Sequence, residues 1–397
     1  MNALYLNAAQ FKAECEKCLQ CPAKPCEKAC PANVSPHDFI AAAKKGDFKT
    51  AAELILKQNP LAETCGLICP DKFCRKACLR AHLDCAIKIP QIQAYIMKKY
   101  RETVENHPSP APAEKTQKFA VIGAGPAGIG AAAELLKSGF SVEVFEKSAN
   151  LGGTLKMIPD LRLPKEIVAR EWENLARNGG LTFHFNQEIV EPKTLLEQGF
   201  AGVVVAIGEN KFCKLGIEGE NLALNYDEYL LNPQKYSGAE NMAIVGGGAV
   251  AVDCAITAKN NGAKHTEMFV RRRLSDMRIT GAERASLLEN QIDITTMTRI
   301  TKIKKDGEKL TAYCCKTRIN SEEKLEDIPN TEIARNGFDY IVLALGSYAE
   351  TIPEQSEKIV FAGDCVNGSS TAVEAVASGK SAAEKLLKTL DKFSFLR

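Results

Sequence analysis

The residues with the clearest chemical potential are cysteines near the start of the chain. Ten of the 15 cysteines in this 397-residue sequence precede residue 86. Most of them fall into two runs, Cys18-x2-Cys21-x4-Cys26-x3-Cys30-Pro31 and Cys65-x3-Cys69-Pro70-x3-Cys74-x3-Cys78. Short spacings of this kind let several thiolates converge on one inorganic centre. In a long chain without a secretory signal, clustered thiols more often bind metal than form disulfides. The two runs therefore predict two metal centres.

Two kinds of centre use four thiolates. Zinc sites are one kind, and [4Fe–4S] clusters are the other, with the fourth ligand taken from outside the run in two-cluster ferredoxins. A proline directly follows Cys30 and again Cys69, as it does in bacterial ferredoxins. This favours two [4Fe–4S] clusters with crossed ligation, and two zinc sites remain the alternative. Cys15 and Cys85 lie outside the spacing and are expected to be spectators. The later, scattered cysteines are expected to be ordinary buried residues: Cys213, Cys254, Cys314, Cys315 and Cys365.

A first glycine-rich motif indicates dinucleotide binding. It follows a predicted strand at 119–122 and opens a predicted helix at 126–137, and its residues are Gly123, Gly125, Pro126, Ala127 and Gly128. Glycines there allow a tight turn and a close approach of the backbone to a pyrophosphate, which the N-terminus of the helix stabilises. Glu146 closes the next predicted strand, 141–145, where a carboxylate can accept hydrogen bonds from ribose hydroxyls.

A second motif of the same plan begins about 120 residues later. It lies between predicted strands at 243–245 and 267–270, with a predicted helix at 250–260, and its residues are Gly246, Gly248, Ala249, Val250 and Ala251. The strand that follows ends in Arg271, Arg272 and Arg273 instead of an acidic residue. Arginine at this place can pair with a 2′-phosphate, so the motif favours NADP, with NAD still open.

Near the C-terminus, Gly363 and Asp364 follow a predicted strand at 359–361 and precede a predicted helix from about Thr371 to Leu390. A carboxylate there can bind ribityl hydroxyls, and the N-terminus of the helix can face the pyrimidine edge of a flavin. We therefore assign FAD to the first motif and the nicotinamide dinucleotide to the second.

These motifs require particular elements to position them. Residues 1–105 are predicted to be helical, with helices at 36–45 and 47–57, and the proline-rich segment 106–118 is predicted to be a linker. Two Rossmann-like α/β domains follow, the second inserted in the first. Their predicted bounds are 119–225 for the first part of the FAD-binding domain, 226–338 for the NAD(P)H-binding domain, and 339–397 for the second part of the FAD-binding domain.

The bulk composition excludes some classes of partner. The net charge is only +2, with 25% charged residues, so neither nucleic acid nor an anionic membrane is an expected partner. No apolar run reaches the length of a membrane span. The first 15 residues lack a basic stretch followed by an apolar core, so we expect a cytosolic protein without a secretory signal.

The motifs also resemble a known family along nearly the whole chain. The sequence resembles the small NAD(P)H/FAD/iron–sulfur subunit of bacterial dihydropyrimidine dehydrogenases and the N-terminal half of the eukaryotic enzyme, within the wider family of glutamate synthase small subunits. The matching stretches are CLQCPAKPCEKACP, CGLICPDKFCRKAC, VIGAGPAGIGAAAEL, LGGTLKMIPDLRLPKEI, MAIVGGGAVAVDCA, FVRRRLSDMR and FAGDCVNGSSTAVEAVASGKSAA.

The resemblance implies a residue-by-residue assignment. One cluster would be held by Cys18, Cys21, Cys26 and Cys78. The other would be held by Cys30, Cys69, Cys74 and the side chain of Gln93, with Gln91 as the near alternative and Cys65 close but unligated. FAD would also contact Gly153, Thr154 and Arg162, and NADP would contact Arg271, Arg272 and Arg278.

Two departures from related families shape the expected function. The segment Gly152–Met157 lacks the CxxxxC motif that follows the paired glycines in disulfide reductases, so electrons are expected to leave through the clusters. The sequence also lacks the FMN-carrying barrel domain, so a separate catalytic subunit, expected to contain FMN, would reduce the pyrimidine. We expect hydride transfer from NADPH C4 to flavin N5, which needs no acid–base residue. The alternatives are a glutamate synthase small subunit and a non-enzymatic cluster- or zinc-binding module.

Overall fold

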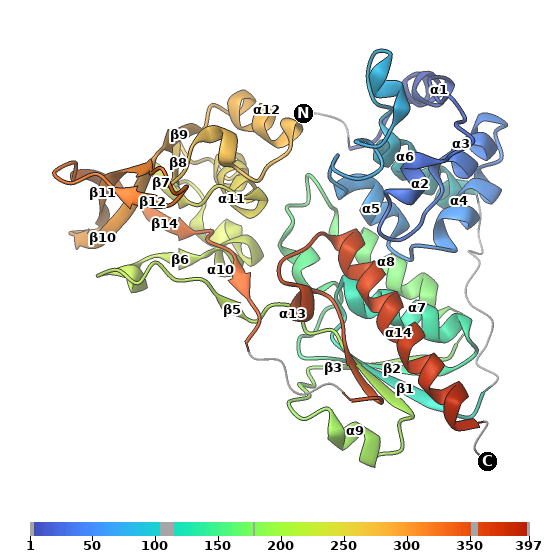
Figure 1. Ribbon diagram of the computed structural model, residues 1–397. Helices are drawn as coiled ribbons and strands as arrows, with labels where there is room; N and C mark the ends of the chain where they lie inside the picture. The colour runs from blue at the N-terminus through green and yellow to red at the C-terminus, as the bar shows by residue number, and fades with distance from the viewer. Residues whose placement is uncertain (1–3, 104–114, 178, 351–355, 395–397) are drawn as a thin grey trace. The chain divides into compact units, whose positions relative to one another are not determined.

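The computed structural model describes residues 4–103, 115–177, 179–350 and 356–394, and Figure 1 shows its elements. Most of the predicted linker, 106–118, lies outside these residues. The chain forms two compact units. The first contains Met1–Lys156, Asp160–Asn210 and Tyr348–Arg397, and the second contains Met157–Pro159 and Lys211–Ser347. Because the second unit interrupts the first, the predicted insertion of one nucleotide-binding domain in the other is confirmed.

The first unit begins with short helices, as predicted. Their bounds are α1 (Ala8–Glu16), α2 (Pro25–Lys28), α3 (Pro36–Lys44), α4 (Phe48–Leu56), α5 (Ala62–Ile68), η1 (Leu79–His82) and α6 (Ile89–Thr103). Local caps begin some of them: the Asp47 side chain accepts a hydrogen bond from the Thr50 N–H at 3.0 Å. Helices of this length are not stable alone in water, so burial of apolar side chains such as Ile40, Ile55 and Ile92 holds them together.

The rest of the first unit is built on a parallel sheet of order β16-β4-β1-β2-β3. The strands are β1 (Lys118–Ile122), β2 (Ser141–Glu146), β3 (Leu181–Phe185), β4 (Gly202–Val205) and β16 (Ile359–Phe361). The helices are α7 (Pro126–Lys137), η2 (Gly153–Met157), α8 (Lys165–Ala176), α9 (Lys193–Glu197), α13 (Asp364–Asn367) and α14 (Ala372–Ser394). The predicted βαβ unit of β1, α7 and β2 is confirmed.

Helices α7 and α14 lie side by side and approach unusually closely (Figure 1). A Cβ atom on Gly379 would lie 1.9 Å from the Ala127 carbonyl oxygen, and one on Gly130 would lie 2.3 Å from the Val376 carbonyl oxygen. Only glycine permits this spacing, since any side chain would meet the facing backbone.

We call residues 4–103 the helical part of the first unit, and the rest of that unit its nucleotide-binding part. Two lysines of the nucleotide-binding part contact the end of α4 in the helical part. The Lys137 ammonium donates to the Lys57 carbonyl oxygen at 2.6 Å, and the Lys380 ammonium donates to the Gln58 carbonyl oxygen at 2.8 Å. Cations at a helix C-terminus satisfy carbonyl groups that lack partners within the helix.

The second unit contains a parallel sheet of order β6-β14-β7-β8-β9. Its strands are β6 (Leu224–Asn225), β7 (Asn241–Val245), β8 (His265–Val270), β9 (Asp293–Thr296) and β14 (Tyr340–Leu343). Its helices are η3 (Glu220–Leu222), α10 (Tyr226–Leu231), η4 (Pro233–Tyr236), α11 (Ala249–Asn260), η5 (Leu274–Asp276) and α12 (Gly281–Glu289). The predicted second βαβ unit of β7, α11 and β8 is confirmed.

Two predicted boundaries differ from the observed units. The main segment of the second unit begins at Lys211 and not at residue 226, and β6 pairs with β14 in it. We expected the chain to return to the FAD-binding domain at residue 339, but β14 pairs with β7 in the second unit and the chain re-enters the first unit at Tyr348. A short apolar strand carries no mark of the sheet to which it belongs, so its pairing was not readable from the sequence. The short strands β5 (Lys211–Phe212) and β15 (Ser347–Tyr348) lie where the chain enters and leaves the second unit.

An antiparallel sheet in the second unit was not predicted. It consists of β10 (Thr298–Asp306), β11 (Lys309–Ile319), β12 (Leu325–Asp327) and β13 (Ile333–Phe338). Its buried side chains, among them Ile300 and Leu310, share one core with Val245 and Phe269 of the parallel sheet. The antiparallel sheet thus covers one face of the parallel sheet.

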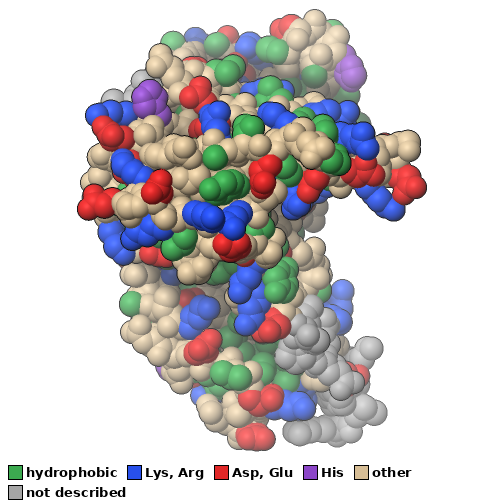
Figure 2. Space-filling model, turned by 90° about the vertical axis from the view of Figure 1, so that its left-hand side faces the viewer, with side chains coloured by type: hydrophobic (Ala, Val, Ile, Leu, Met, Phe, Trp, Pro, Cys, Tyr) green, Lys and Arg blue, Asp and Glu red, His purple; other side chains and the backbone are tan. Residues whose placement is uncertain are grey.

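The surface agrees with the near-neutral composition. On the face shown in Figure 2, acidic and basic side chains are interspersed. Among the residues described, no helix is both long and apolar enough to cross a bilayer.

The close contact between α7 and α14 generates a prediction. Gly379→Ala would force the two helices apart, and overpacking of this kind costs about 1–3 kcal/mol, more than the ~1 kcal/mol gained by replacing a helical glycine with alanine. We expect a lower melting temperature in differential scanning calorimetry. The matched control is Gly281→Ala in α12, where an added Cβ meets no atom within 4 Å. Equal melting temperatures for the two variants would contradict the packing described above.

Candidate cofactor sites

Four predicted cluster ligands surround one cavity in the helical part, which we call the Cys18 cavity. Its walls contain Cys18, Cys21, Cys26 and Cys78, from the loop after α1, from α2 and from the residue before η1. The space between them, which is partly open to solvent, amounts to about 400 Å³. Apolar residues complete the walls: Leu19, Ile40, Leu79, Ile87 and Ile89.

A second cavity, the Cys30 cavity, brings together the other predicted set. Its walls contain Cys30, Cys69, Cys74 and Gln93, and its space measures about 430 Å³. Cys65, which sequence analysis set aside as unligated, also lines it. The two cavities share Pro36 and Ile89 as wall residues, so the two sites are neighbours.

Gln93 is placed to offer an oxygen to the Cys30 cavity. Its Nε2 donates to the Ala62 carbonyl oxygen at 2.6 Å, and the residue is only 8% exposed. Because the amide nitrogen is held by this bond, the amide oxygen remains available as a ligand. Gln91 does not line the cavity, and its buried Oε1 has no hydrogen-bond partner.

The thiols surround a space and do not converge on a point. Within the described ranges, no three Cys, His, Asp or Glu side chains are grouped closely enough to hold a single ion. Burial raises the pKa of Cys26 to about 11 and that of Cys74 to about 12. A hydrogen bond with Cys65, together with burial, raises the pKa of Cys69 well above its ordinary value. These thiols are protonated at neutral pH in the metal-free protein, so metal binding must release protons.

The remaining cysteines line neither cavity. Cys15 is buried and Cys85 is exposed. The later cysteines are buried as expected, except Cys213, which is partly exposed in the loop after β5.

In the first unit, the first glycine motif forms a tight turn between β1 and α7. Gly123 has a φ of +102°, and a Cβ there would lie 2.4 Å from the Ala206 carbonyl oxygen. Gly125 is the N-cap of α7, Pro126 is its first residue, and Ala127 and Gly128 follow in its first turn. The N–H groups of that turn lack acceptors within the helix and can bind a pyrophosphate.

The Glu146 carboxylate lies against this turn at the end of β2. It accepts hydrogen bonds from the Ala124 N–H at 2.9 Å and from the Ser148 N–H at 2.9 Å. Its Oε1 also accepts from the Ser148 hydroxyl at 2.8 Å. Although Glu146 is only 7% exposed, its Oε2, which accepts from the Ala124 N–H, has a second lone pair for a ribose hydroxyl.

Two other segments meet the same turn. A Cβ on Gly153 would lie 2.9 Å from the Gly125 Cα, so η2, which also contains Thr154, passes directly over the motif. A Cβ on Gly363 would lie 2.7 Å from the Ala127 Cβ. The structure therefore brings these predicted FAD-binding residues together at the carboxyl ends of the strands. Arg162 is partly exposed in the loop before α8.

Asp364 and the first turn of α14 complete this side of the first unit. Burial raises the pKa of Asp364, which accepts a hydrogen bond from the Ser370 hydroxyl. Thr371 caps α14 in a reciprocal pair with Glu374. Two residues further on, Val373 lines the Cys30 cavity. One helical turn therefore touches both the predicted flavin site and a predicted cluster site, which the sequence alone did not indicate.

In the second unit, the second glycine motif forms the same kind of turn. Gly246 has a φ of +149°, and a Cβ there would lie 2.3 Å from the Ala344 carbonyl oxygen. Gly248 is the N-cap of α11, whose first residues are Ala249, Val250 and Ala251.

The predicted phosphate-binding arginines follow β8. Arg271, Arg272 and Arg278 are all exposed. The Arg278 N–H donates to the Gly247 carbonyl oxygen at 3.1 Å, which places Arg278 beside the glycine motif. Arg273 is held by an ion pair with Asp276 at 3.0 Å. Arg278 thus lies beside the second glycine motif, and Arg271 and Arg272 directly follow β8. Binding of a 2′-phosphate by these arginines stays a prediction.

Comparisons with known proteins identify two regions. Residues 2–105 match the family model for dihydropyrimidine dehydrogenase domain II, 4Fe-4S cluster, and residues 117–379 match the model for pyridine nucleotide-disulphide oxidoreductases. The first match decides between the two kinds of metal centre in favour of iron–sulfur.

Full-length relatives support both matches. The chain is 31% identical to the NAD-dependent dihydropyrimidine dehydrogenase subunit PreT of Escherichia coli O157:H7, over 94% of this chain and 92% of that one. It is 26% identical to the small chain of the NADPH glutamate synthase of Escherichia coli K12, over 96% of this chain and 92% of that one. Among solved structures, it resembles Mycobacterium tuberculosis FprA in complex with NADPH, with a TM-score of 0.58 and 16% identity over 70% of this chain and 86% of that one.

The cavity assignments generate a prediction that uses two nearby cysteines. Cys78 lines the Cys18 cavity, whereas Cys85 is exposed and lines neither cavity. Cys78→Ser should therefore lower the iron content of anaerobically purified protein from about eight atoms per chain to about four, while Cys85→Ser should leave it unchanged. Iron and sulfide analysis would measure this, and equal loss in both variants would refute the assignment.

Proposed function

The chain belongs to the pyridine nucleotide-disulphide oxidoreductase family and carries a 4Fe-4S domain of the dihydropyrimidine dehydrogenase type, and from this premise we propose that it passes electrons from NADPH to a partner subunit. Its cofactors are FAD, 4Fe–4S clusters and a nicotinamide dinucleotide. When bound, the flavin accepts a hydride and releases electrons singly to the clusters, so the protein itself supplies binding and orientation.

The observation that carries the proposal is the continuity of the sites within the first unit. The first turn of α14 connects the flavin site to the Cys30 cavity through Val373. Pro36 and Ile89 separate the Cys30 cavity from the Cys18 cavity. We assign Cys30, Cys69, Cys74 and Gln93 to the cluster nearer the flavin, and Cys18, Cys21, Cys26 and Cys78 to the farther one.

The residues of the nucleotide sites take defined roles in this proposal. Glu146 holds the ribose of FAD, and the first turn of α7 holds its pyrophosphate. Arg271, Arg272 and Arg278 bind the 2′-phosphate and ribose of NADPH. No side chain acts as a general acid or base.

Electrons would leave from the Cys18 cavity. Its wall residues Leu19 and Leu79 are 44% and 43% exposed, and Leu83, one turn after Leu79, is 68% exposed. Around them, residues 17–30 contain three lysines and one glutamate, and residues 75–88 contain four basic residues and one aspartate. Acidic residues pair with four of these cations: Lys17 with Glu14, Lys24 with Asp38, Arg75 with Asp71 and Arg80 with Asp84. The exposed leucines therefore define the docking surface, an apolar patch that fits an apolar surface of the partner subunit.

The partner would perform the substrate chemistry. Similarity to PreT over almost the full length supports a catalytic subunit, containing FMN, that reduces uracil or thymine. Similarity to the glutamate synthase small chain supports a glutamate-forming partner, which is the second candidate because the identity is lower. Identification of the subunit that co-purifies from the native host decides between them.

Anaerobic stopped-flow mixing with NADPH tests the first step. The visible absorbance of the flavin should bleach. Arg271→Ala should raise the NADPH concentration needed for half-maximal bleaching by about tenfold, the loss of one charge-assisted pair, with little effect on bleaching by NADH. Arg318→Ala, an exposed arginine on β11, is the control. Flavin that stays oxidised with both nucleotides would rule out the proposed function.

Leu83→Glu tests the exit surface. Leu83 is 68% exposed and does not line the Cys18 cavity. A carboxylate there should weaken apolar docking, so the yield of co-purified catalytic subunit should fall, while bleaching by NADPH and the iron content stay unchanged. The control is Leu288→Glu on α12, which is also 68% exposed. Undiminished partner binding by Leu83→Glu would contradict this surface.

A further inference from the structure

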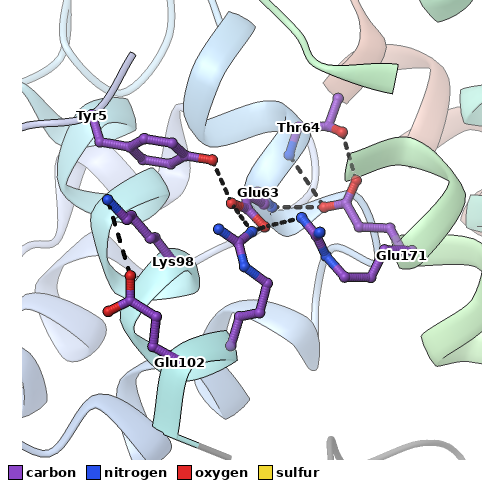
Figure 3. A network of polar contacts seen from close by, with 8 residues as sticks. Tyr5, Glu63, Thr64, Lys98, Glu102 and Glu171 are labelled. Atoms are coloured by element: carbon purple, nitrogen blue, oxygen red, sulfur yellow. Dashed lines mark hydrogen bonds and ion pairs between the residues drawn. The ribbon is translucent and has the colours of Figure 1, made fainter. Parts of the chain in front are cut away.

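A buried carboxylate from the nucleotide-binding part enters the helical part beside the Cys30 cavity. Glu171 lies on α8 and is 7% exposed. Its carboxylate accepts hydrogen bonds from the Glu63 N–H at 2.7 Å, from the Thr64 N–H at 3.1 Å and from the Thr64 hydroxyl at 2.5 Å (Figure 3). Three donors of the first turn of α5 thus converge on one side chain more than 100 residues away in the sequence.

This carboxylate caps α5. The residue at the N-cap position, Leu61, has no side-chain acceptor, so the first N–H groups of the helix lack a local partner. Glu171 supplies that acceptor, since its Oε1 accepts from both N–H groups. Burial, together with the nearby Glu63 charge, raises the pKa of Glu171 to about 8, and the hydrogen bonds from Thr64 and Glu63 oppose this shift.

The turn is also held on its other side. The Glu63 carboxylate pairs with Arg101 of α6 at 2.5 Å and with Arg170 of α8 at 3.1 Å, and it accepts a hydrogen bond from the Tyr5 hydroxyl at 2.6 Å. Helices α5, α6 and α8 therefore meet in one polar network (Figure 3).

The first turn of α5, held by Glu171 and by the contacts of Glu63, determines the orientation of the Gln93 amide group. The carbonyl group of Ala62, the residue before Glu63, accepts the hydrogen bond from Gln93 Nε2. A carboxamide can present either its oxygen or its nitrogen to a site, because a half-turn of the group exchanges them. The bond to Ala62 selects the oxygen for the cavity. The same helix contains Cys65, and Cys69 is its C-cap residue; both line the cavity.

We propose that Glu171 is a positioning residue for the Cys30 cavity: by fixing the first turn of α5, it fixes the Ala62 carbonyl group and thereby the ligand orientation of Gln93. The inference rests on the proposed function, in which this cavity holds a cluster with Gln93 as its non-thiolate ligand. Groups that orient a metal ligand through hydrogen bonds typically change metal affinity by about 10–100-fold when they are removed.

The test compares Glu171→Ala with Glu171→Gln in the full-length protein, purified anaerobically. A glutamine can still accept both N–H bonds, so it should restore the wild-type behaviour that alanine loses. Glu173→Ala is the matched control, because Glu173 lies on the same helix and is exposed. Thr64→Val provides a milder variant that removes only the hydroxyl bond, in case Glu171→Ala does not fold.

The readout is the electron paramagnetic resonance spectrum of each dithionite-reduced variant, together with its iron and FAD content. We expect Glu171→Ala to alter or remove the signal of one cluster, with about four iron atoms lost at most, and to leave the other signal and FAD content unchanged. Thr64→Val should change the signal of the same cluster by a smaller amount than Glu171→Ala does. On a Gln93→Ala background, Glu171→Ala should change the spectrum no further, because the two residues act through one contact.

Two results would overturn the inference. One is a Glu171→Ala spectrum identical to that of Glu173→Ala, and the other is a lower melting temperature with both cluster signals intact, which is a purely structural effect. Dithionite reduces the clusters without NADPH, so neither result bears on nucleotide oxidation. Wild-type protein without any cluster signal would instead overturn the proposed function itself.

Discussion

The first unit depends on the contact between α7 and α14 through two glycines. Gly130 and Gly379 let the two helix backbones approach to a distance that no side chain allows. This contact fixes α14 against the turn that follows β1. Because Thr371 caps α14 and Val373 lies in its first turn, the position of α14 also sets the distance between the flavin site and the Cys30 cavity. A helix–helix contact that touches no cofactor therefore determines how two cofactor sites are spaced.

The sequence predicted well the elements that chemistry constrains locally. Gly123 and Gly246 each require a positive φ and a close approach to a neighbouring strand, so both βαβ units were found with nearly correct bounds. The antiparallel sheet β10–β13 was missed because no motif marks it, and β14 was assigned to the wrong domain because its four apolar residues fit either sheet. Pairing between distant strands is a tertiary property that periodicity does not encode.

In the candidate sites too, local sequence patterns revealed some features, and others depend on tertiary contacts. Cysteine spacing and family resemblance named two ligand sets, and each set lines one cavity. Other features depend on contacts between residues far apart in the sequence, so no local pattern could reveal them. Val373 reaches the Cys30 cavity from the C-terminal helix, and Glu171 reaches α5 from α8. Cys65 lines the Cys30 cavity, in agreement with the expectation that it lies close to that cluster.

The two lysines that reach α4 bear on how this protein could be divided. Lys137 and Lys380 donate to carbonyl groups at the end of α4, just as Glu171 accepts from the start of α5. The end of α4 and the start of α5 therefore both take hydrogen-bond partners from the nucleotide-binding part. A cut in the 104–114 segment would separate donors from acceptors at each of these points. The helical part therefore cannot be moved to another protein on its own. A gene fusion that joined it to another reductase would need a matching lysine pair and a matching carboxylate in that reductase.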